Sequence, residues 1–240
     1  MWYEIPRIKI KPTFNRILRM KSTHTLVLLL SITLIFELPT NGQAVESVQQ
    51  ATGSLLKVEA EDFYKQTKTD QRKWYVVSAG FQSDLKSEED SLHLDDASGG
   101  KYLEVLPDTR TNHQEKLVHG VNFSNEPGVM AVVHYQVNLT DTGRYYIWVR
   151  AYSTGSEDNG VHVGMDGQWP ESGQRMQWCE VKNSWKWASK QRTREQHCGV
   201  PGLIYLDVKS PGAHDIQFSM REDGFEMDQW IMTTDPEYNP

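Results

Sequence analysis

Residues 129–152 read VMAVVHYQVNLTDTGRYYIWVRAY. Both halves of this stretch, 129–139 and 144–152, are rich in β-branched and aromatic residues, which favour extended strands. The segment TDTG between them has the composition of a turn and predicts a hairpin-like connection. The stretch therefore predicts two strands in succession, and Trp148, inside the second, is expected to lie in the core.

The same pattern recurs along the chain. Short segments rich in β-branched and aromatic residues alternate with Gly, Pro and Asp, and no helical period is sustained. Short strands with this punctuation are typical of sandwiches and barrels. The sequence thus predicts an all-β fold whose further strands lie at 55–63, 74–81, 101–106, 160–167, 203–210 and 213–220.

The N-terminal part of the chain has the features of an export signal. Residues 25–38 are almost entirely apolar, but the run is shorter than the roughly 20 residues of a membrane span. Gly42 and Ala44 stand at the minus-three and minus-one positions of a cleavage site. We therefore expect a signal peptide region over 1–44, with translation starting at Met20, and a secreted or periplasmic mature protein; an uncleaved membrane anchor is the alternative.

Past the signal region, the organisation is that of one domain. Residues 45–54 are polar and predict a short linker, 55–234 form the β domain, and 235–240 form a tail. The chain has two cysteines, Cys179 and Cys198. In an exported protein they are expected to form a disulfide bond, although two separate buried thiols remain an alternative.

The charge balance argues against nucleic acid as a partner. The formal net charge is −7, whereas a nucleic-acid-binding protein presents a basic face. One local basic cluster, KQRTRE at 190–195, stands out in this acidic chain. It would suit a sulfated or carboxylated polymer, and the alternative is an ordinary solvated loop.

Carboxylates occur in a segment that otherwise looks buried. Residues 218–233 read FSMREDGFEMDQWIMT and contain Glu222, Asp223, Glu226 and Asp228 between apolar residues. Ionised carboxylates are costly to bury unless they are paired or hold a metal. Alternation along a strand places Asp228 on the same face as the apolar residues Trp230 and Met232.

A second group of carboxylates lies in the first predicted strand. Glu59 and Glu61, in VEAEDF, are two residues apart and share a face of a strand. If the first and last strands are neighbours, Asp228 converges with them, and three hard oxygen donors suit calcium. The alternative is that these acids are solvated charges at a sheet edge.

Candidate sugar contacts are tryptophans and polar loop residues. Exposed indole rings stack on sugar rings, and Asp, Asn and Arg bind hydroxyl groups. The alternatives are core packing for the tryptophans and turn chemistry for the loops SEDNG and REDG. The candidates are Trp74, Trp169, Trp185, Trp187, Asp158, Asn159, Arg221, Glu222 and Asp223.

The motifs follow one another in an order that resembles the family 6 carbohydrate-binding modules and their relatives, over residues 55–234. The motifs are VEAEDF, ASGGKYLEV (97–105), YQVNLTDTGRYYIWVRAYS (135–153), GVHVGMDG (160–167), LDVKSPGAHDIQFSM (206–220) and FEMDQWIMT (225–233). The resemblance implies a β-sandwich jelly roll in which Glu59, Glu61 and Asp228 hold a structural calcium ion. It also implies a sugar cleft among loops at one end, with a contact from the 221–226 region.

One departure from the family pattern concerns the sugar platform. Family members often carry an Asn-Gly-Asp-Trp turn before the central strand, but 125–135 here contains no Trp. Trp74, Trp169, Trp185 or Trp187 is therefore expected to supply the platform. The long segment 169–199 exceeds the simplest family pattern and is where we expect specificity to reside.

Three hypotheses of function follow. The first is a secreted, non-catalytic module that binds a polysaccharide, such as a charged plant or algal polymer, and brings an enzyme acting in trans close to it. The second is a jelly-roll glycoside hydrolase or polysaccharide lyase using Glu222, Asp223 and Glu226, with His162 or His197 assisting a lyase. The third is a structural or adhesive protein whose sandwich packs against a partner.

Overall fold

The computed structural model describes residues 48–83, 85, 91–179 and 181–240. The predicted signal peptide region, 1–44, lies outside the described residues. Within these ranges no helix is long and apolar enough to cross a membrane.

The described chain forms two β-sheets, which confirms the predicted all-β sandwich. The first, called here the β6 sheet, contains β1 (Gln49–Gln50), β3 (Lys65–Thr67), β6 (Val132–Leu139), β8 (Gly160–Met165), β9 (Met176–Gln177), β11 (Lys190–Gln191), β12 (Val200–Pro201) and β14 (Gly212–Met220). The second, the β7 sheet, contains β2 (Leu55–Glu59), β4 (Lys73–Ser78), β5 (Lys101–Leu106), β7 (Gly143–Tyr152), β10 (Lys186–Ala188), β13 (Tyr205–Val208) and β15 (Glu226–Thr233). Within the described ranges, strands are also connected by the 3₁₀ turns η1 (Ala60–Asp62), η2 (Ser98–Gly100) and η3 (Glu171–Gly173).

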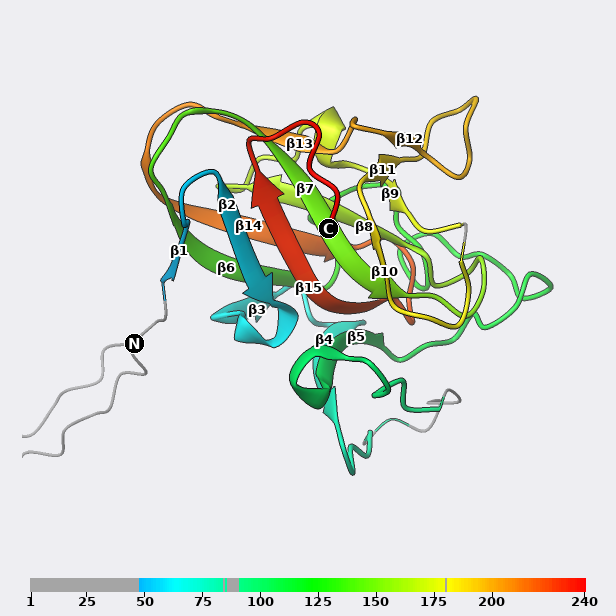
Figure 1. The fold of residues 1–240 in the computed structure, drawn as a ribbon. Coiled ribbons are helices and arrows are strands. Elements are labelled where there is room, and N and C mark those ends of the chain that lie inside the picture. The colour runs from blue at the N-terminus through cyan, green and yellow to red at the C-terminus, as the bar shows by residue number, and fades with distance from the viewer. Residues whose placement is uncertain (1–47, 84, 86–90, 180) are drawn as a thin grey trace, which may run out of the picture. The chain divides into compact units, whose positions relative to one another are not determined.

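The two sheets lie face to face around one core. In Figure 1 the β7 sheet, with β15 in red and β7 in green, lies in front of β6 and β14. Tyr135 of β6 packs edge-on against Trp230 of β15, with ring centroids 5.1 Å apart, and Phe218 of β14 contacts the same indole. These contacts from facing sheets hold the sandwich together, because aromatic pairs add to the free energy of apolar burial.

The segment TDTG does not form the expected hairpin-like connection. β6 pairs with β14, β3 and β1, whereas β7 pairs with β15, β10 and β13, so the turn passes from one sheet to the other and does not close a hairpin. The turn between β13 and β14 does the same. Both arches contain a glycine with positive φ, Gly143 at 129° and Gly212 at 124°, a region that glycine adopts readily.

The structure also describes part of the expected linker and both cysteines. Gln49 and Gln50, inside the expected linker, pair in parallel with Val137 and Asn138, so β1 extends the β6 sheet. Cys179 and Cys198 form a disulfide bond, with their Cα atoms 5.2 Å apart. The bond ties the loop that follows β11 to the end of β9.

Candidate functional site

The carboxylates of the 218–233 segment are paired with basic side chains. Asp223, fully buried, accepts a hydrogen bond of 3.0 Å from Arg72, and Glu222 forms an ion pair with Arg221. The two others are equally buried: an oxygen of Glu226 lies 2.6 Å from Nδ1 of His93, and Asp228 forms an ion pair with Arg150. Pairing therefore accounts for acids in a buried segment.

Asp228 reaches its partner because β15 contains a bulge. Met227 lies opposite Ala151 and Gln229 lies opposite Arg150, so Asp228 is an extra residue between them. A bulge redirects one side chain, and the Asp228 carboxylate meets Arg150 and the backbone N–H of Ser98, at 2.8 Å. The expectation that Asp228 follows the alternation of Trp230 is therefore wrong.

Glu59, Glu61 and Asp228 gather around the η2 turn. β2 and β15 are antiparallel neighbours, with Glu59 opposite Gln229. The hydroxyl of Ser98 donates to Glu59 (3.1 Å), while its N–H donates to Asp228. The strands thus bring Glu59 and Asp228 to one place, and Glu61, in η1, lies beside Gly99 of the same turn.

The chemistry of this cluster fits a hard cation in part. Glu59 and Glu61 each have a buried oxygen, Oε2, with no hydrogen-bond partner among the described residues. Burial raises the pKa of Glu61, and the nearby Glu59 raises it further, while a backbone hydrogen bond lowers it. Asp228, by contrast, is already neutralised by Arg150, and in the part of the chain that the structure describes no group of three His, Cys, Asp or Glu is arranged to hold a metal ion.

The polar loop candidates form a buried network and do not face solvent. Asp158 accepts hydrogen bonds from the Ser153 hydroxyl (2.9 Å) and the Thr154 N–H (2.6 Å), which closes its own loop. Glu222 accepts from the N–H of Asn159 at 3.0 Å. Asp158, Asn159, Arg221, Glu222 and Asp223 are each at most 5 % exposed. Most of their oxygens and nitrogens bind protein groups, which corrects the expectation that they read sugar hydroxyls. Among the described residues the exceptions in this set are Nε of Arg221 and Oδ1 of Asp223.

His162 belongs to the same buried region and is held as a neutral ring. Nε2 lies 3.0 Å from the Ser124 carbonyl, which it donates to, and Nδ1 accepts from the backbone N–H of Arg175 at 3.1 Å. Burial lowers the pKa of His162 to about 3, and the positive charges of Arg221 and Arg175 lower it as well. These two hydrogen bonds to the backbone indicate that His162 has a structural role.

His162 is expected to make the free energy of unfolding depend on pH in the acid range. Between pH 6.5 and about 3 the unfolded chain binds a proton at His162 that the folded chain does not. The free energy of unfolding should therefore fall as the pH drops through this window, by up to about 1.4 kcal/mol per pH unit from this residue. Urea denaturation of His162→Gln at pH 7, 6 and 5 should show a shallower fall than the native chain, whereas the exposed His197→Gln control should match the native slope. Equal slopes for the native chain and His162→Gln would contradict this account.

The four candidate tryptophans lie in three different places. Trp74 is 1 % exposed and donates from its indole nitrogen to the Ala131 carbonyl (2.8 Å), so it is a core residue and corrects its prediction as a platform. Trp169 is half-buried over Gly164 of β8 and Gly128, on the β6 sheet. Trp185 and Trp187 lie at and beside β10, on the β7 sheet.

The outward face of β7 carries a row of large side chains. Burial alternates along this strand: Tyr145, Ile147, Val149 and Ala151 are in the core. The side chains between them are half-buried and point away from the other sheet: Tyr146, Trp148, Arg150 and Tyr152. At about 3.3 Å per residue the row is about 20 Å long. Trp148 is therefore a surface residue and not the core residue that was expected.

One end of this row opens into a cavity of about 680 Å³, which we call the polar hollow. Its floor is aromatic: the Tyr152 ring stacks on His93 at 3.9 Å, and the Trp185 ring packs against Tyr152 at 5.5 Å. Trp185 donates to the His93 carbonyl, 3.0 Å away, and so is held in place. Hydrogen-bonding groups line the rim, among them Ser91, Asp95, Asp96, Arg150, Asn183 and Lys186.

The other end of the row opens into a second cavity of about 300 Å³, which we call the aromatic hollow. Tyr146, Trp148 and Trp187 line it, and Trp187 lies opposite Arg150 in the strand register. The tail passes over β7 in Figure 1, and Pro236 and Asn239 form part of the wall. Residues of both β7 and β10 line each of the two hollows.

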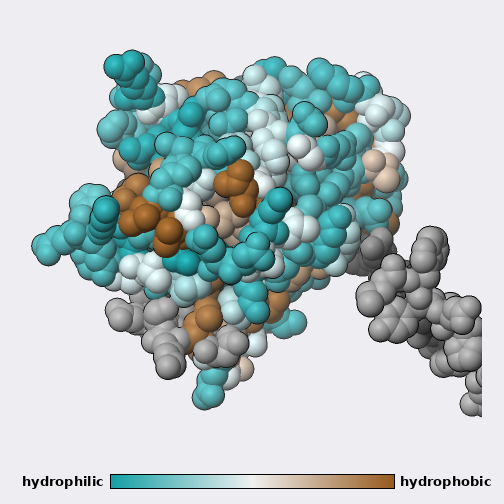
Figure 2. Space-filling model, turned by 180° about the vertical axis from the view of Figure 1, so that it is seen from behind, coloured by the Kyte–Doolittle hydropathy of each residue, from teal (hydrophilic) through white to brown (hydrophobic). Residues whose placement is uncertain are grey.

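The combined surface places aromatic rings beside hydrogen-bonding side chains. Half-buried indole and phenol rings offer flat apolar faces, and the neighbouring hollow offers two carboxylates, one amide and a guanidinium. Figure 2, which views the other side of the molecule, shows a mostly hydrophilic surface with scattered brown patches. Sequence reasoning found Trp187 but missed Tyr146, Trp148 and Arg150. The signal was available, because Arg144 and Arg150 share a strand face with both aromatic residues and mark that face as outward. Trp185 is only 6 % exposed and packs beneath the polar hollow, which corrects its prediction as an exposed platform.

No family model matches the chain. A curated protein of Formosa agariphila, named "Uncharacterized protein P23", is 58 % identical over 186 residues, which are 78 % of this chain and 45 % of that protein. The chain thus spans less than half the length of this relative.

Solved structures with a similar arrangement include carbohydrate-binding modules. The C-terminal family 6 module of the laminarinase LamC from Zobellia galactanivorans is 15 % identical, with a TM-score of 0.39 over 75 % of this chain and 99 % of the module. A family 35 module from Clostridium thermocellum is 15 % identical, with a TM-score of 0.38 over 75 % of this chain and 97 % of the module. A xanthan lyase from Paenibacillus is 15 % identical, with a TM-score of 0.42 over 75 % of this chain and 13 % of the lyase.

Proposed function

We propose that this chain is a secreted, non-catalytic carbohydrate-binding domain that holds a polysaccharide along the outward face of β7. The observation that carries the proposal is the pair of indoles Trp148 and Trp187 in one open hollow, next to a polar hollow. Sugar rings would stack on the indoles, and their hydroxyl groups would bind the polar side chains around Arg150.

The length of the row supports a polymeric ligand. Tyr146 and Tyr152 stand about 20 Å apart along β7, which exceeds the size of a single sugar ring. The two hollows have volumes of about 680 and 300 Å³, and small-molecule sites typically occupy about 300–1,000 Å³. We therefore expect affinity to rise from mono- to oligosaccharide.

The placement of the acids supports a binding role over a catalytic one. A glycosidase needs two carboxylates that face the scissile bond. Glu222 and Asp223 are buried and paired with Arg221 and Arg72, and His162 is buried with both ring nitrogens engaged. Of the groups invoked for a hydrolase or lyase, Glu222, Asp223 and His162 are thus committed to the protein interior and Glu226 is buried beside His93, whereas His197 is exposed.

A polysaccharide screen tests the proposal. The full chain is run in native gels that contain neutral, uronate-containing or sulfated plant and algal polysaccharides, and each polymer is also assayed for released reducing ends and unsaturated products. We expect retardation by at least one polymer and no product. Unretarded migration in every gel would contradict the binding proposal, and product formation would contradict its non-catalytic part.

The proposal includes a structural calcium ion held by Glu59 and Glu61, with backbone carbonyls as further ligands. It is supported by two buried carboxylate oxygens beside the η2 turn, one from each residue, that have no hydrogen-bond partner within the described part of the chain. Calcium at 100 times its Kd should raise the free energy of unfolding by about 2.7 kcal/mol relative to chelator. The thermal midpoint is measured with calcium and with chelator, for the native chain, for Glu61→Gln and for the exposed control Glu126→Gln.

Two outcomes decide the calcium prediction. A calcium-dependent rise of the midpoint that is lost in Glu61→Gln and kept in Glu126→Gln supports it. The same midpoint with calcium and with chelator contradicts it.

Export and an enzyme partner complete the proposal. The disulfide between Cys179 and Cys198 is typical of a protein that folds in an oxidising compartment. A domain that holds a polymer raises the effective concentration of any enzyme linked to or associated with it. The partner in this role would be a polysaccharide-degrading enzyme.

A further inference from the structure

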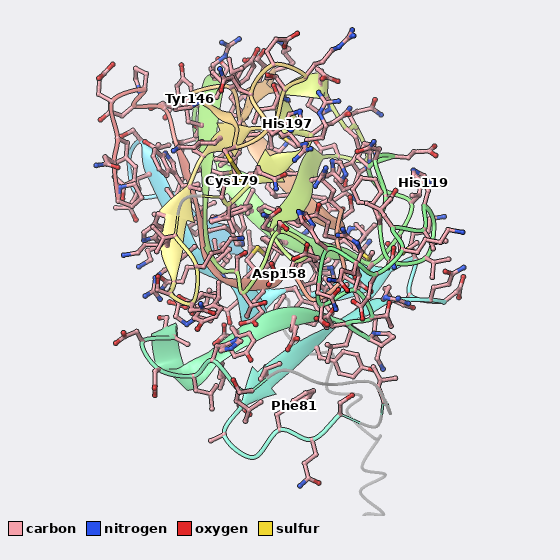
Figure 3. All side chains as sticks on the ribbon, turned by 90° about the vertical axis from the view of Figure 1, so that its right-hand side faces the viewer. Phe81, His119, Tyr146, Asp158, Cys179 and His197 are labelled. Carbon is pink, nitrogen blue, oxygen red and sulfur yellow. A yellow bond between two sulfur atoms is a disulfide. The ribbon has the colours of Figure 1, made fainter. Side chains whose placement is uncertain are left out.

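A cluster of arginines lies at the loop end of the sandwich, apart from the two hollows. A cavity of about 370 Å³, called here the arginine pocket, is lined by Phe123, Asn125, Arg175, Arg192, Thr193, Arg194 and Arg221. Figure 3 looks onto this end, with His119 labelled on one loop and His197 and Cys179 on the disulfide-linked segment. The lining residues come from these two loops and from the ends of β9, β11 and β14.

The positive charge in this pocket exceeds the negative charge that balances it. Of its four guanidinium groups, that of Arg221 pairs with Glu222 and that of Arg175 pairs with Glu171. Arg192 and Arg194 form no ion pair with any residue in the described ranges. The excess is local, because the whole chain carries a formal net charge of −7.

Arg221 contributes a buried hydrogen-bond donor to the lining of the pocket. Its side chain is only 4 % exposed, and its Nε has no hydrogen-bond partner among the described residues. A buried donor without an acceptor is unfavourable, and more so when the group is charged. The Phe123 ring covers the guanidinium, with the carbon Cζ 4.9 Å from the ring centroid, and limits the access of water.

The pocket is held in shape before any ligand arrives. The N–H of Arg192 donates to the Arg175 carbonyl (2.8 Å), and Nε of Arg175 donates back to the Arg192 carbonyl (3.2 Å). The turn that follows is closed by a bond from the Thr193 N–H to Gln196. The disulfide between Cys179 and Cys198 anchors the same turn. Preorganisation lowers the entropy that binding costs.

We propose that the arginine pocket binds the anionic substituent of an acidic glycan, a sulfate ester or a uronate carboxylate. Guanidinium groups bind both through paired, charge-assisted hydrogen bonds. This inference rests on the proposed function and adds the substrate class, an acidic polysaccharide. A nucleic acid is a poorer match, because the chain carries a formal net charge of −7, whereas nucleic-acid-binding proteins present a basic face.

Nuclear magnetic resonance of the arginine Nε–H groups reads this pocket directly. The full ¹⁵N-labelled chain is titrated with sodium sulfate and, separately, with sodium glucuronate, at constant ionic strength kept with sodium chloride. We expect saturable shifts of the Arg221 and Arg192 signals and no shift of Arg144, which pairs with Asp207 on an exposed surface. The double variant Arg192→Gln, Arg194→Gln should weaken the affinity at least tenfold.

The two titrations separate the two sources of charge. Saturation with sulfate alone identifies a sulfate ester, and saturation with glucuronate alone identifies a uronate. Saturation with neither, or an unchanged affinity in the double variant, overturns the proposal. Gel retardation by neutral polymers that persists in the double variant would leave the β7-face site standing, so failure of this inference is distinguishable from failure of the proposed function.

Discussion

Replacement of Trp148 by alanine is expected to reduce the affinity for the retained polysaccharide about 30-fold. The indole is half-buried, stands on the outward face of β7 and lines the aromatic hollow with Trp187. Tryptophans at the centre of a binding surface commonly contribute about 2 kcal/mol, which corresponds to this factor. Trp187→Ala should show a similar loss. The measurement is isothermal titration with an oligosaccharide cut from the polymer that the gels identify.

Trp169 supplies the matched control for this prediction. It is also half-buried, but it packs over Gly164 on the β6 sheet, on the other side of the sandwich. Trp169→Ala should change the affinity less than twofold, and circular dichroism would verify that each variant is folded. A loss in Trp169→Ala together with native affinity in Trp148→Ala would place the ligand on the opposite sheet and contradict the account.

Replacement of Asp223 by alanine is expected to lower the free energy of unfolding by about 3–5 kcal/mol. The carboxylate is fully buried and accepts hydrogen bonds from Arg72 (3.0 Å), the Thr109 N–H (3.0 Å) and the Thr109 hydroxyl (2.7 Å). Burial raises the pKa of Asp223, and the bonds from Thr109 and Arg72 lower it in part. Without Asp223, the buried guanidinium of Arg72 is left as an uncompensated charge. Removing one partner of a buried ion pair lowers the free energy of unfolding strongly.

The exposed pair of Arg144 and Asp207 provides the comparison. The Asp207 side chain is 40 % exposed, and such surface pairs contribute at most about 1 kcal/mol. Denaturant titration should therefore show a small change for Asp207→Ala and a large one for Asp223→Ala. If Asp223→Ala kept native stability and lost glycan binding, the residue would be a ligand contact, as its loop position suggested, and the structural role would be wrong.

The strands were predictable from sequence, but their partners were not. The β-branched and aromatic content of 129–139 and 144–152 predicted both strands, and β6 and β7 occupy most of these ranges. Whether a short turn closes a hairpin or arches to the facing sheet depends on tertiary packing. The composition of TDTG therefore predicted a turn correctly but not that its two strands belong to different sheets. Similarly, spacing alone does not reveal a bulge, and the one in β15 sends Asp228 to Arg150.

The candidate site was predictable only in part, for two physical reasons. Asp223 finds its partner Arg72 at a sequence separation of 151 residues, so local spacing gave no indication that this acid is structural. On β7 both faces carry aromatic residues, and hydrophobicity alone does not separate Tyr145, which is buried, from Tyr146, which is half-buried. Arg144 and Arg150 share one face of the strand, and their charge identifies that face, which also carries Trp148, as the outward one.

A crystal structure of the full chain with the retained oligosaccharide tests the central claim most directly. The account predicts sugar rings stacked on Trp148 or Trp187, with hydroxyl groups directed into the polar hollow beside Arg150. Sugar rings bound over Trp169 on the β6 sheet, with the hollows on the β7 face left open, would contradict it.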